Sequence, residues 1–124
     1  MNQVLAIAGG GAIGALLRYW VSSGVYLLAG RDFPYGTLVV NVLGSLLMGF
    51  LYIWLLERTL GGVAMRAFVL IGLLGAFTTF STFSMETLNL IEAGHMGKAI
   101  LNTLMSVVLC IGAAALGVML ARQL

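Results

Sequence analysis

Charged residues are scarce in this sequence of 124 residues, where Asp, Glu, Lys and Arg together make up only 8%. An average soluble domain is about 25% charged, so this chain has too little polar surface to cover a water-soluble particle. Hydrophobic residues reach 61%, and the mean hydropathy is +1.10. These values predict an integral membrane protein that has lipid as its main solvent.

Other absences narrow the class further. The six Lys and Arg residues never form a run and the net charge is +2, which argues against nucleic acid as a partner. A single cysteine, Cys110, excludes a disulfide within the chain. The N-terminal segment lacks the basic start of a signal peptide, so we expect it to be the first membrane span, retained in the mature protein.

Long apolar stretches are what the sequence has in abundance. A spanning helix needs about 20 mostly apolar residues, and four stretches qualify. We predict an all-α fold with a single transmembrane domain over residues 1–124 and helices at about 3–29, 35–56, 66–91 and 98–121. Nearly all the charge lies in the separators at 30–34, 57–66 and 92–98, and the only proline, Pro34, ends the first of them.

The charges flanking the predicted spans are nearly balanced across the membrane. Arg58, Arg66 and Arg122 fall on the side of the termini, and Arg31 and Lys98 fall on the other side. Three against two is almost no positive-inside bias, so it predicts insertion in both orientations and antiparallel dimers. One wrongly assigned span would give the same balance.

Small residues recur at intervals that suit close helix packing. Gly10-x-x-x-Gly14 lies in the first span and Ser45-x-x-x-Gly49 in the second. Either motif can join two copies of the chain or pack two helices of one copy, and the sequence does not separate these alternatives.

A glycine pattern in the first span imitates a dinucleotide-binding fingerprint. Gly9-x-Gly11-x-x-Gly14 is followed eighteen residues later by Asp32. The fingerprint requires a strand, a turn and a helix within a βαβ unit, and no later segment offers a parallel strand. A glycine-rich packing face on a membrane helix is the better interpretation.

Polar side chains follow helical stripes inside the apolar spans. At every fourth position the sequence has Thr37, Asn41 and Ser45 in the second span and Asn102, Ser106 and Cys110 in the fourth. Polar groups in a bilayer are costly and usually face a cavity or a partner. Although Ser and Thr often bond back to their own helix, stripes in several spans predict a polar pathway.

The third span contains the densest polar cluster, GAFTTFSTFS at 75–84, in which hydroxyl residues alternate with phenylalanines. Gly72, Gly75 and the β-branched residues weaken the helix there. A break whose freed backbone carbonyls form a site for a small cation is one outcome. An unbroken helix with back-bonded hydroxyls is the other.

The chemistry of the predicted pathway favours an anion. Hydroxyls and amides donate hydrogen bonds without charge, and the embedded charged residues are Arg18 and Glu86. A cation pathway would normally show carboxylate rings or organised carbonyls. Phenylalanine ring edges carry partial positive charge, so Phe80 and Phe83 can stabilise an anion edge-on; packing in the core or against lipid is their alternative role.

Three segments resemble a known family. GGGAIGALLRYW, GTLVVNVLGSLLMG and GLLGAFTTFSTFSMET, in the first three spans, look like the signature segments of the Fluc fluoride channels, also called CrcB. The resemblance covers all four spans. It implies a dual-topology homodimer of two antiparallel subunits with two fluoride pores, in the bacterial inner membrane. It also implies passive export of fluoride that lowers its toxicity, and no enzymatic activity.

The resemblance further implies roles for individual residues. The pore would be lined by Phe80, Phe83, Asn41, Ser81, Thr82, Thr37, Asn102, Ser106 and Cys110. The backbone carbonyls of Gly75 and Thr78, one pair from each subunit, would hold a structural Na+ at the dimer centre. Arg18 would lie near the aqueous vestibule and Glu86 near the opposite end of the pore.

Two other functions fit the same span count. A dual-topology exporter of the small multidrug resistance type would be expected to have a glutamate in its first helix, where this sequence has Arg18 and no acid. A membrane scaffold without transport activity would use the polar stripes only for packing.

Overall fold

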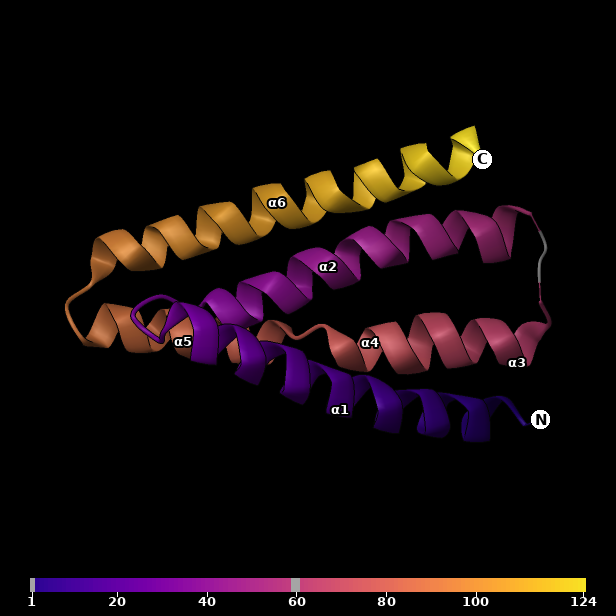
Figure 1. The fold of residues 1–124 in the computed structure, drawn as a ribbon, viewed down its shortest axis with the longest axis horizontal. Coiled ribbons are helices and arrows are strands. Elements are labelled where there is room, and N and C mark those ends of the chain that lie inside the picture. Colours follow the sequence, from indigo (N-terminus) through magenta and orange to yellow (C-terminus); the bar gives the residue numbers. More distant parts are fainter. Residues whose placement is uncertain (1, 59–60) are drawn as a thin grey trace.

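The computed structural model describes residues 2–58 and 61–124, which form a bundle of four long helical spans with both termini at one end (Figure 1). The third span consists of several helical segments. In order, the elements are α1 (Gln3–Ala29), α2 (Tyr35–Tyr52), the π-helical η1 (Ile53–Glu57), α3 (Val63–Arg66), the π-helical η2 (Ala67–Leu73), α4 (Leu74–Phe77), α5 (Phe80–Glu92) and α6 (Met96–Gln123). The predicted all-α fold with four spans is confirmed; of the predicted separator 57–66, Thr59 and Leu60 lie outside the described residues.

The ends of the spans are set by local sequence. The Asn2 side chain accepts a hydrogen bond from the Val4 N–H at 2.7 Å and caps the start of α1. At the other end of α1, Gly30 has φ 83°, a left-handed conformation that glycine adopts without strain. Gly94, with φ 84°, makes the corresponding turn between α5 and α6. These turns fold the chain back on itself as antiparallel helices.

Glycines bring the backbones of neighbouring helices together within one chain. A Cβ atom on Gly14 of α1 would collide with the backbone of Leu73 in η2. A Cβ atom on Gly49 of α2 would collide with the backbone of Ala114 in α6. The glycines of both small-residue motifs therefore pack inside the subunit, whereas Ser45 of the second motif lines a groove.

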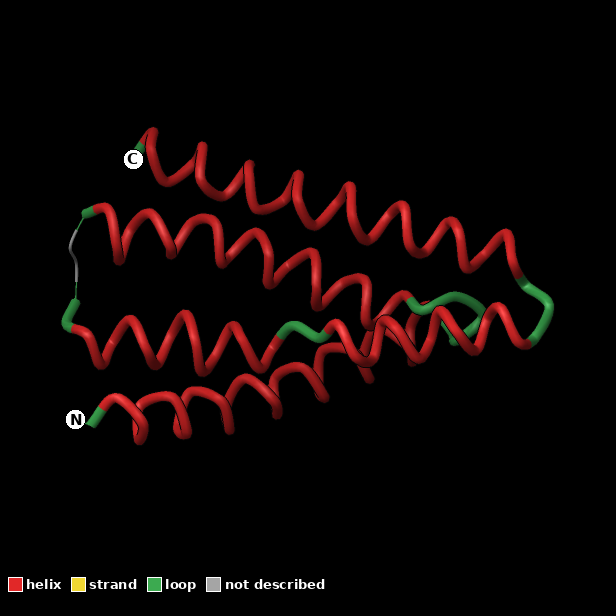
Figure 2. The backbone as a smooth tube through the Cα atoms, turned by 180° about the vertical axis from the view of Figure 1, so that it is seen from behind, coloured by secondary structure: helices red, strands yellow, loops and turns green. Residues whose placement is uncertain are grey.

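The third span is interrupted between α4 and α5 (Figure 2). Thr78 has φ −86° and ψ 159°, and Thr79 has φ −151° and ψ 120°, so both residues are extended. The interruption turns neighbouring phenylalanines to different surroundings. Phe77 at the end of α4 is 5% exposed, whereas Phe80 at the start of α5 is 79% exposed.

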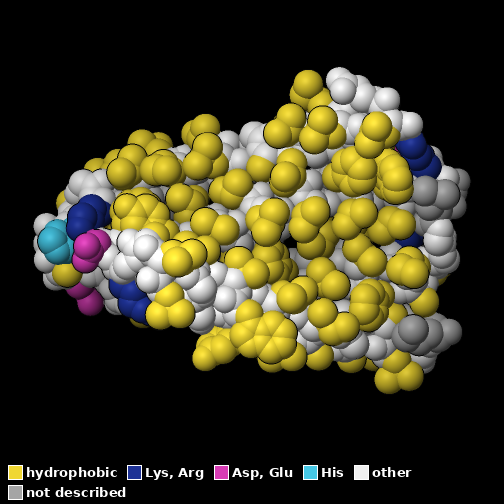
Figure 3. Space-filling model, viewed as in Figure 1, with side chains coloured by type: hydrophobic (Ala, Val, Ile, Leu, Met, Phe, Trp, Pro, Cys, Tyr) yellow, Lys and Arg dark blue, Asp and Glu magenta, His cyan; other side chains and the backbone are white. Residues whose placement is uncertain are grey.

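Apolar side chains cover most of the visible face of the bundle, and charged side chains gather at its two ends (Figure 3). In the most apolar part of each span only 11% to 28% of the residues are buried within the chain. Four helices long and apolar enough to cross a bilayer, with so much apolar surface uncovered, define a multi-pass membrane protein.

Candidate functional site

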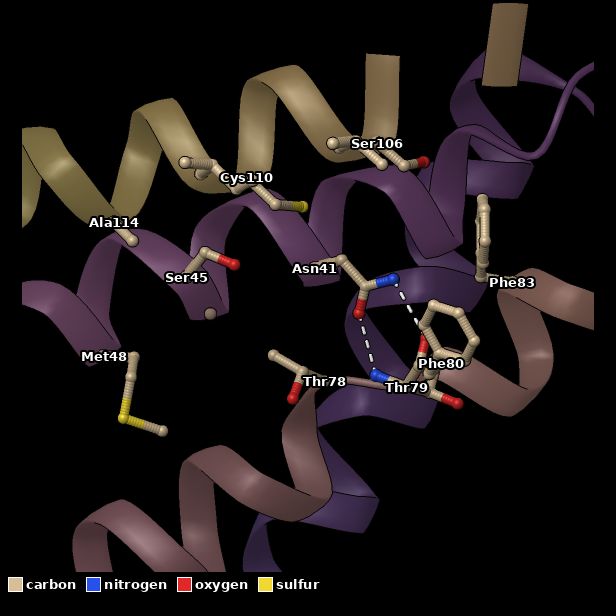
Figure 4. Close-up of a pocket in the computed structure, with 13 residues that line it drawn as sticks. Asn41, Ser45, Met48, Thr78, Thr79, Phe80, Phe83, Ser106, Cys110 and Ala114 are labelled. Carbon is tan, nitrogen blue, oxygen red and sulfur yellow. Dashed lines mark hydrogen bonds between the residues drawn. The ribbon is translucent and has the colours of Figure 1, made fainter. Parts of the chain in front are cut away.

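A groove of about 420 Å³ opens between α2, α6 and the interruption of the third span (Figure 4). It brings together seven residues predicted from sequence for the polar pathway or the cation site: Asn41, Ser45, Thr78, Phe80, Phe83, Ser106 and Cys110. The rest of its lining comes from Gly44, Met48, Thr79, Val107, Ile111 and Ala114. None of the described residues that line it is charged, so the polar groups of this lining are neutral.

Asn41 of α2 holds the interruption in place. Its Nδ2 donates to the Thr79 carbonyl at 3.0 Å, and the Thr79 N–H donates to its Oδ1 at 2.8 Å (Figure 4). Extended backbone inside a membrane protein has no helical partners, so these two bonds satisfy groups that would otherwise be orphaned. The Thr79 hydroxyl oxygen also accepts the Thr82 N–H at 3.2 Å and caps α5.

Arg18 of α1 supports the same interruption through the last turn of α4. Its Nε donates to the Ala76 carbonyl at 3.1 Å. Carbonyls at a helix C-terminus lack intrahelical partners and carry partial negative charge, which a guanidinium group complements. The sequence placed Arg18 in the membrane but gave no indication of this partner.

The hydroxyls of the third span are mostly engaged within the span. Thr78 donates to the Leu74 carbonyl at 3.1 Å and Ser84 to the Phe80 carbonyl at 2.9 Å. Ser81 and Thr82 do not line the groove, and their hydroxyls lie 3.3 Å and 3.2 Å from the Thr79 hydroxyl. The back-bonding that the sequence offered as an alternative to a break occurs together with the interruption.

The groove retains hydroxyls that are not committed to protein partners. Ser45 and Ser106 form no hydrogen bond with other described residues through their side chains, and both line the groove. The ring centroids of Phe80 and Phe83 lie 5.4 Å apart with their planes tilted by 49°. Free donors and tilted rings can therefore meet a small ion in the same space.

Three further residues predicted for the pore or the cation site lie outside the groove. Asn102 is 2% exposed and donates to the Thr87 hydroxyl at 2.9 Å, which joins α6 to α5. Thr37 is 5% exposed, and its hydroxyl lies 3.3 Å from the Tyr26 hydroxyl. Gly75, by contrast, is exposed on the surface of the subunit.

Sequence reasoning missed Tyr26, which joins two of the predicted residues. Its hydroxyl donates to Glu86 Oε2 at 2.5 Å and contacts Thr37. The Arg31 guanidinium carbon lies 4.5 Å from the centre of the Tyr26 ring.

A second cavity of about 360 Å³ is lined by Tyr26, Arg31, Pro34, Glu86, Asn89 and Leu90. An aromatic residue with a polar tip near a helix end is a weak signal, and nothing local pairs it with a residue 60 positions away.

The fold and the site define a class: a multi-pass helical membrane protein whose neutral, phenylalanine-lined groove sits at an interrupted span. Within residues 2–58 and 61–124 no group of three His, Cys, Asp or Glu side chains is arranged to hold a metal ion. The family model described as CrcB-like protein, Camphor Resistance (CrcB), matches residues 5–118. The chain belongs to this family.

Relatives in several bacteria are identical to this chain at more than half of the aligned positions. A Methylococcus capsulatus protein is 58% identical over 122 residues, which cover 98% of this chain and 54% of that protein. Proteins of Coxiella burnetii and Geobacter sulfurreducens are 57% and 51% identical, with 100% of both chains covered. The chain thus spans about half of the first relative and all of the other two. Each is named a fluoride-specific ion channel, FluC, and none is named as an enzyme.

Proposed function

We propose that this chain is the subunit of a fluoride-selective channel through which F− leaves the cytoplasm passively, lowering its toxicity. One observation carries the proposal. A groove lined by neutral donors and phenylalanine rings lies in a chain that is 57% identical, over its whole length, to a protein named as a fluoride-specific channel.

The groove has the chemistry that a fluoride pathway requires. Fluoride is small and strongly hydrated, so a pore must replace its water with close hydrogen-bond donors. Ser45, Ser106 and Cys110 supply such donors without charge, and Phe80 and Phe83 supply polar ring edges. Because no fixed charge lines the groove, an ion can bind and still leave.

We also propose that two subunits pair in antiparallel orientation in the bacterial inner membrane, forming two pores. Phe80 is 79% exposed in the single subunit, so one wall of its pathway is open. Three arginines flank the spans at the end of the termini and two basic residues at the other end, a balance that supports insertion in both directions.

We further propose that backbone carbonyls at the interruption hold a structural Na+ at the dimer centre. In a continuous helix the Thr79 N–H would donate to the Gly75 carbonyl, four residues earlier. Here the Thr79 N–H donates to Asn41 instead, so the Gly75 carbonyl lacks its helical partner. Neutral carbonyl oxygens are suitable ligands for a hard cation such as Na+. Gly75 and Thr78 offer only two carbonyls per chain, so a second copy would complete the shell. A cation bound there would link the interrupted spans of both subunits.

The structure gives no support to a proton-coupled drug exporter. Helix α1 contains no acidic residue, and its only charged side chain, Arg18, is engaged with the Ala76 carbonyl. Of the acids in the other spans, Glu57 and Glu92 are the last residues of theirs, and Glu86 is bonded to Tyr26.

Liposomes loaded with potassium fluoride test the proposal. Purified protein is reconstituted, valinomycin is added to carry the balancing potassium current, and a fluoride electrode records the release. We expect rapid fluoride release from these liposomes, slow release from protein-free liposomes, and little chloride release in a matched chloride assay. Fluoride release no faster than in protein-free liposomes would contradict the channel, and equal chloride release would contradict its selectivity.

A further inference from the structure

The hydroxyl of Tyr26 connects α1 and α2 to Glu86, an acidic residue of the third span. It donates to Glu86 Oε2 of α5 at 2.5 Å. It also lies 3.3 Å from Thr37 Oγ1 and 3.5 Å from the Thr37 N–H of α2. None of these bonds belongs to the groove between α2 and α6, since Tyr26, Thr37 and Glu86 do not line it.

Glu86 lies three residues after Phe83 in α5, and Phe83 lines the groove. From this arrangement we propose that Tyr26 is a positioning residue for Glu86 at this end of the proposed anion pathway. The direction of the bonds follows from the chemistry of the acid. An ionised carboxylate can only accept, so the Tyr26 proton points to Glu86. The lone pairs of the Tyr26 oxygen then accept the N–H and O–H of Thr37. Tyr26 thereby orients the carboxylate and the hydroxyl together.

The orientation of the Tyr26 ring is fixed by contacts that do not involve Glu86. A Cβ atom on Gly36 would collide with the Tyr26 ring and with the Ser22 carbonyl, so only glycine lets the ring lie against α2. The Arg31 guanidinium carbon lies 4.5 Å from the ring centre, within the range of a cation–π interaction. Contacts from α2 and from the α1–α2 connection therefore fix the ring independently of Glu86.

Positioning matters because a carboxylate near an anion pathway repels the ion. Glu86 Oε1 is buried and has no hydrogen-bond partner in the part of the chain that the structure describes. Among the described residues, the bond from Tyr26 to Oε2 is therefore the hydrogen bond that orients this carboxylate. Without it, the carboxylate is free to turn and its charge is less compensated, which raises the barrier to anion passage. This step rests on the proposed channel function.

A double-mutant cycle tests the inference by fluoride flux. Tyr26→Phe removes only the hydroxyl and should reduce flux about tenfold, the lower end of what loss of a hydrogen bond to a charged group produces. Tyr19→Phe, at a residue of the same helix that is 65% exposed, is the matched control and should leave flux unchanged. In a Glu86→Ala background, Tyr26→Phe should change flux less than twofold, because the group it positions is gone. An equal loss in both backgrounds, or no loss in either, would overturn the inference.

Infrared spectroscopy supplies a readout that does not depend on conduction. The difference spectrum between the original protein and Tyr26→Phe should show a shifted carboxylate band, and the same difference in the Glu86→Ala background should not. This comparison decides the role of Tyr26 if Glu86→Ala does not conduct. It also separates the two proposals: without flux in the original protein the channel function fails, while an unshifted band overturns the positioning of Glu86 by Tyr26.

Discussion

The side-chain amide of Asn41 and the backbone of Thr79 are joined by two hydrogen bonds, of 3.0 Å and 2.8 Å, that use both ends of the amide. Asparagine suits this position because it offers a donor and an acceptor side by side, as a peptide group does. One residue of α2 thus takes over the bonding that a continuous helix would have given Thr79. The shape of the groove depends on this pair.

Replacing Asn41 with leucine should destabilise the protein and reduce fluoride flux. Leucine has a similar volume but leaves the Thr79 N–H and carbonyl without partners, at a cost of roughly 1–3 kcal/mol for each buried group. Ser45→Ala is the control for stability alone, since Ser45 lies one turn further along α2 in the same groove and has no protein partner for its hydroxyl among the described residues. Thermal unfolding in detergent measures the difference. Equal midpoints for the two variants would show that the amide bonds do not hold the interruption.

Replacing Phe80 or Phe83 with isoleucine should lower fluoride flux without unfolding the protein. Isoleucine keeps the apolar character but lacks a ring edge with partial positive charge. A loss of about tenfold corresponds to about 1.4 kcal/mol in the barrier. Phe50→Ile serves as the control because Phe50, in the second span, does not line the groove. Its ring centroid lies 5.2 Å from that of Trp54 in the same second span. Flux equal to that of the unmodified protein in both groove variants would assign these rings to packing alone.

Local patterns in the sequence were sufficient for the four spans and for much of the groove. The stripe from Asn41 to Ser45 and the stripe from Ser106 to Cys110 meet across α2 and α6 because a four-residue period keeps each stripe on one helix face. The exposure of Phe80 and the burial of Phe77 were not accessible in this way, since the extended residues between them reset the helical period.

Contacts between distant segments account for what the sequence did not reveal. Tyr26 with Glu86 and Arg18 with Ala76 are separated by about 60 residues, and each pair forms only after the helices have packed. A local signal for the interruption did exist. Thr79 is a good N-cap residue, and its side chain caps α5. In sequence it was hidden among other hydroxyl residues that also bond within the helix.

Two glycines of α1 should respond very differently to the addition of one methyl group. At Gly14 a Cβ atom would collide with the Leu73 backbone, whereas at Gly24 it would meet nothing within 4 Å. Gly14→Ala should therefore destabilise the protein by about 1–3 kcal/mol through overpacking. Gly24→Ala should be neutral or stabilising, since alanine is the better helix former by about 1 kcal/mol. Thermal unfolding of both variants in detergent checks this, and similar stabilities would mean that α1 and η2 separate easily.

Added lysines should control the orientation of the chain and expose any need for antiparallel pairing. Gly62→Lys with Val63→Lys raises the basic residues at the end of the termini from three to five, against two at the other end. Both sites are open among the described residues, where a Cβ on Gly62 meets no atom within 4 Å and Val63 is 63% exposed.

A matching variant, Met96→Lys with Gly97→Lys, has three basic residues at the end of the termini and four at the other end. If antiparallel pairing is required, the first variant expressed alone should lose most fluoride flux, because nearly all copies insert one way. Co-expression with the second variant should restore it. Uptake of fluoride by cells, read with an electrode, distinguishes these results. Full activity of the first variant alone, with labelling that shows a single orientation, would contradict the antiparallel dimer.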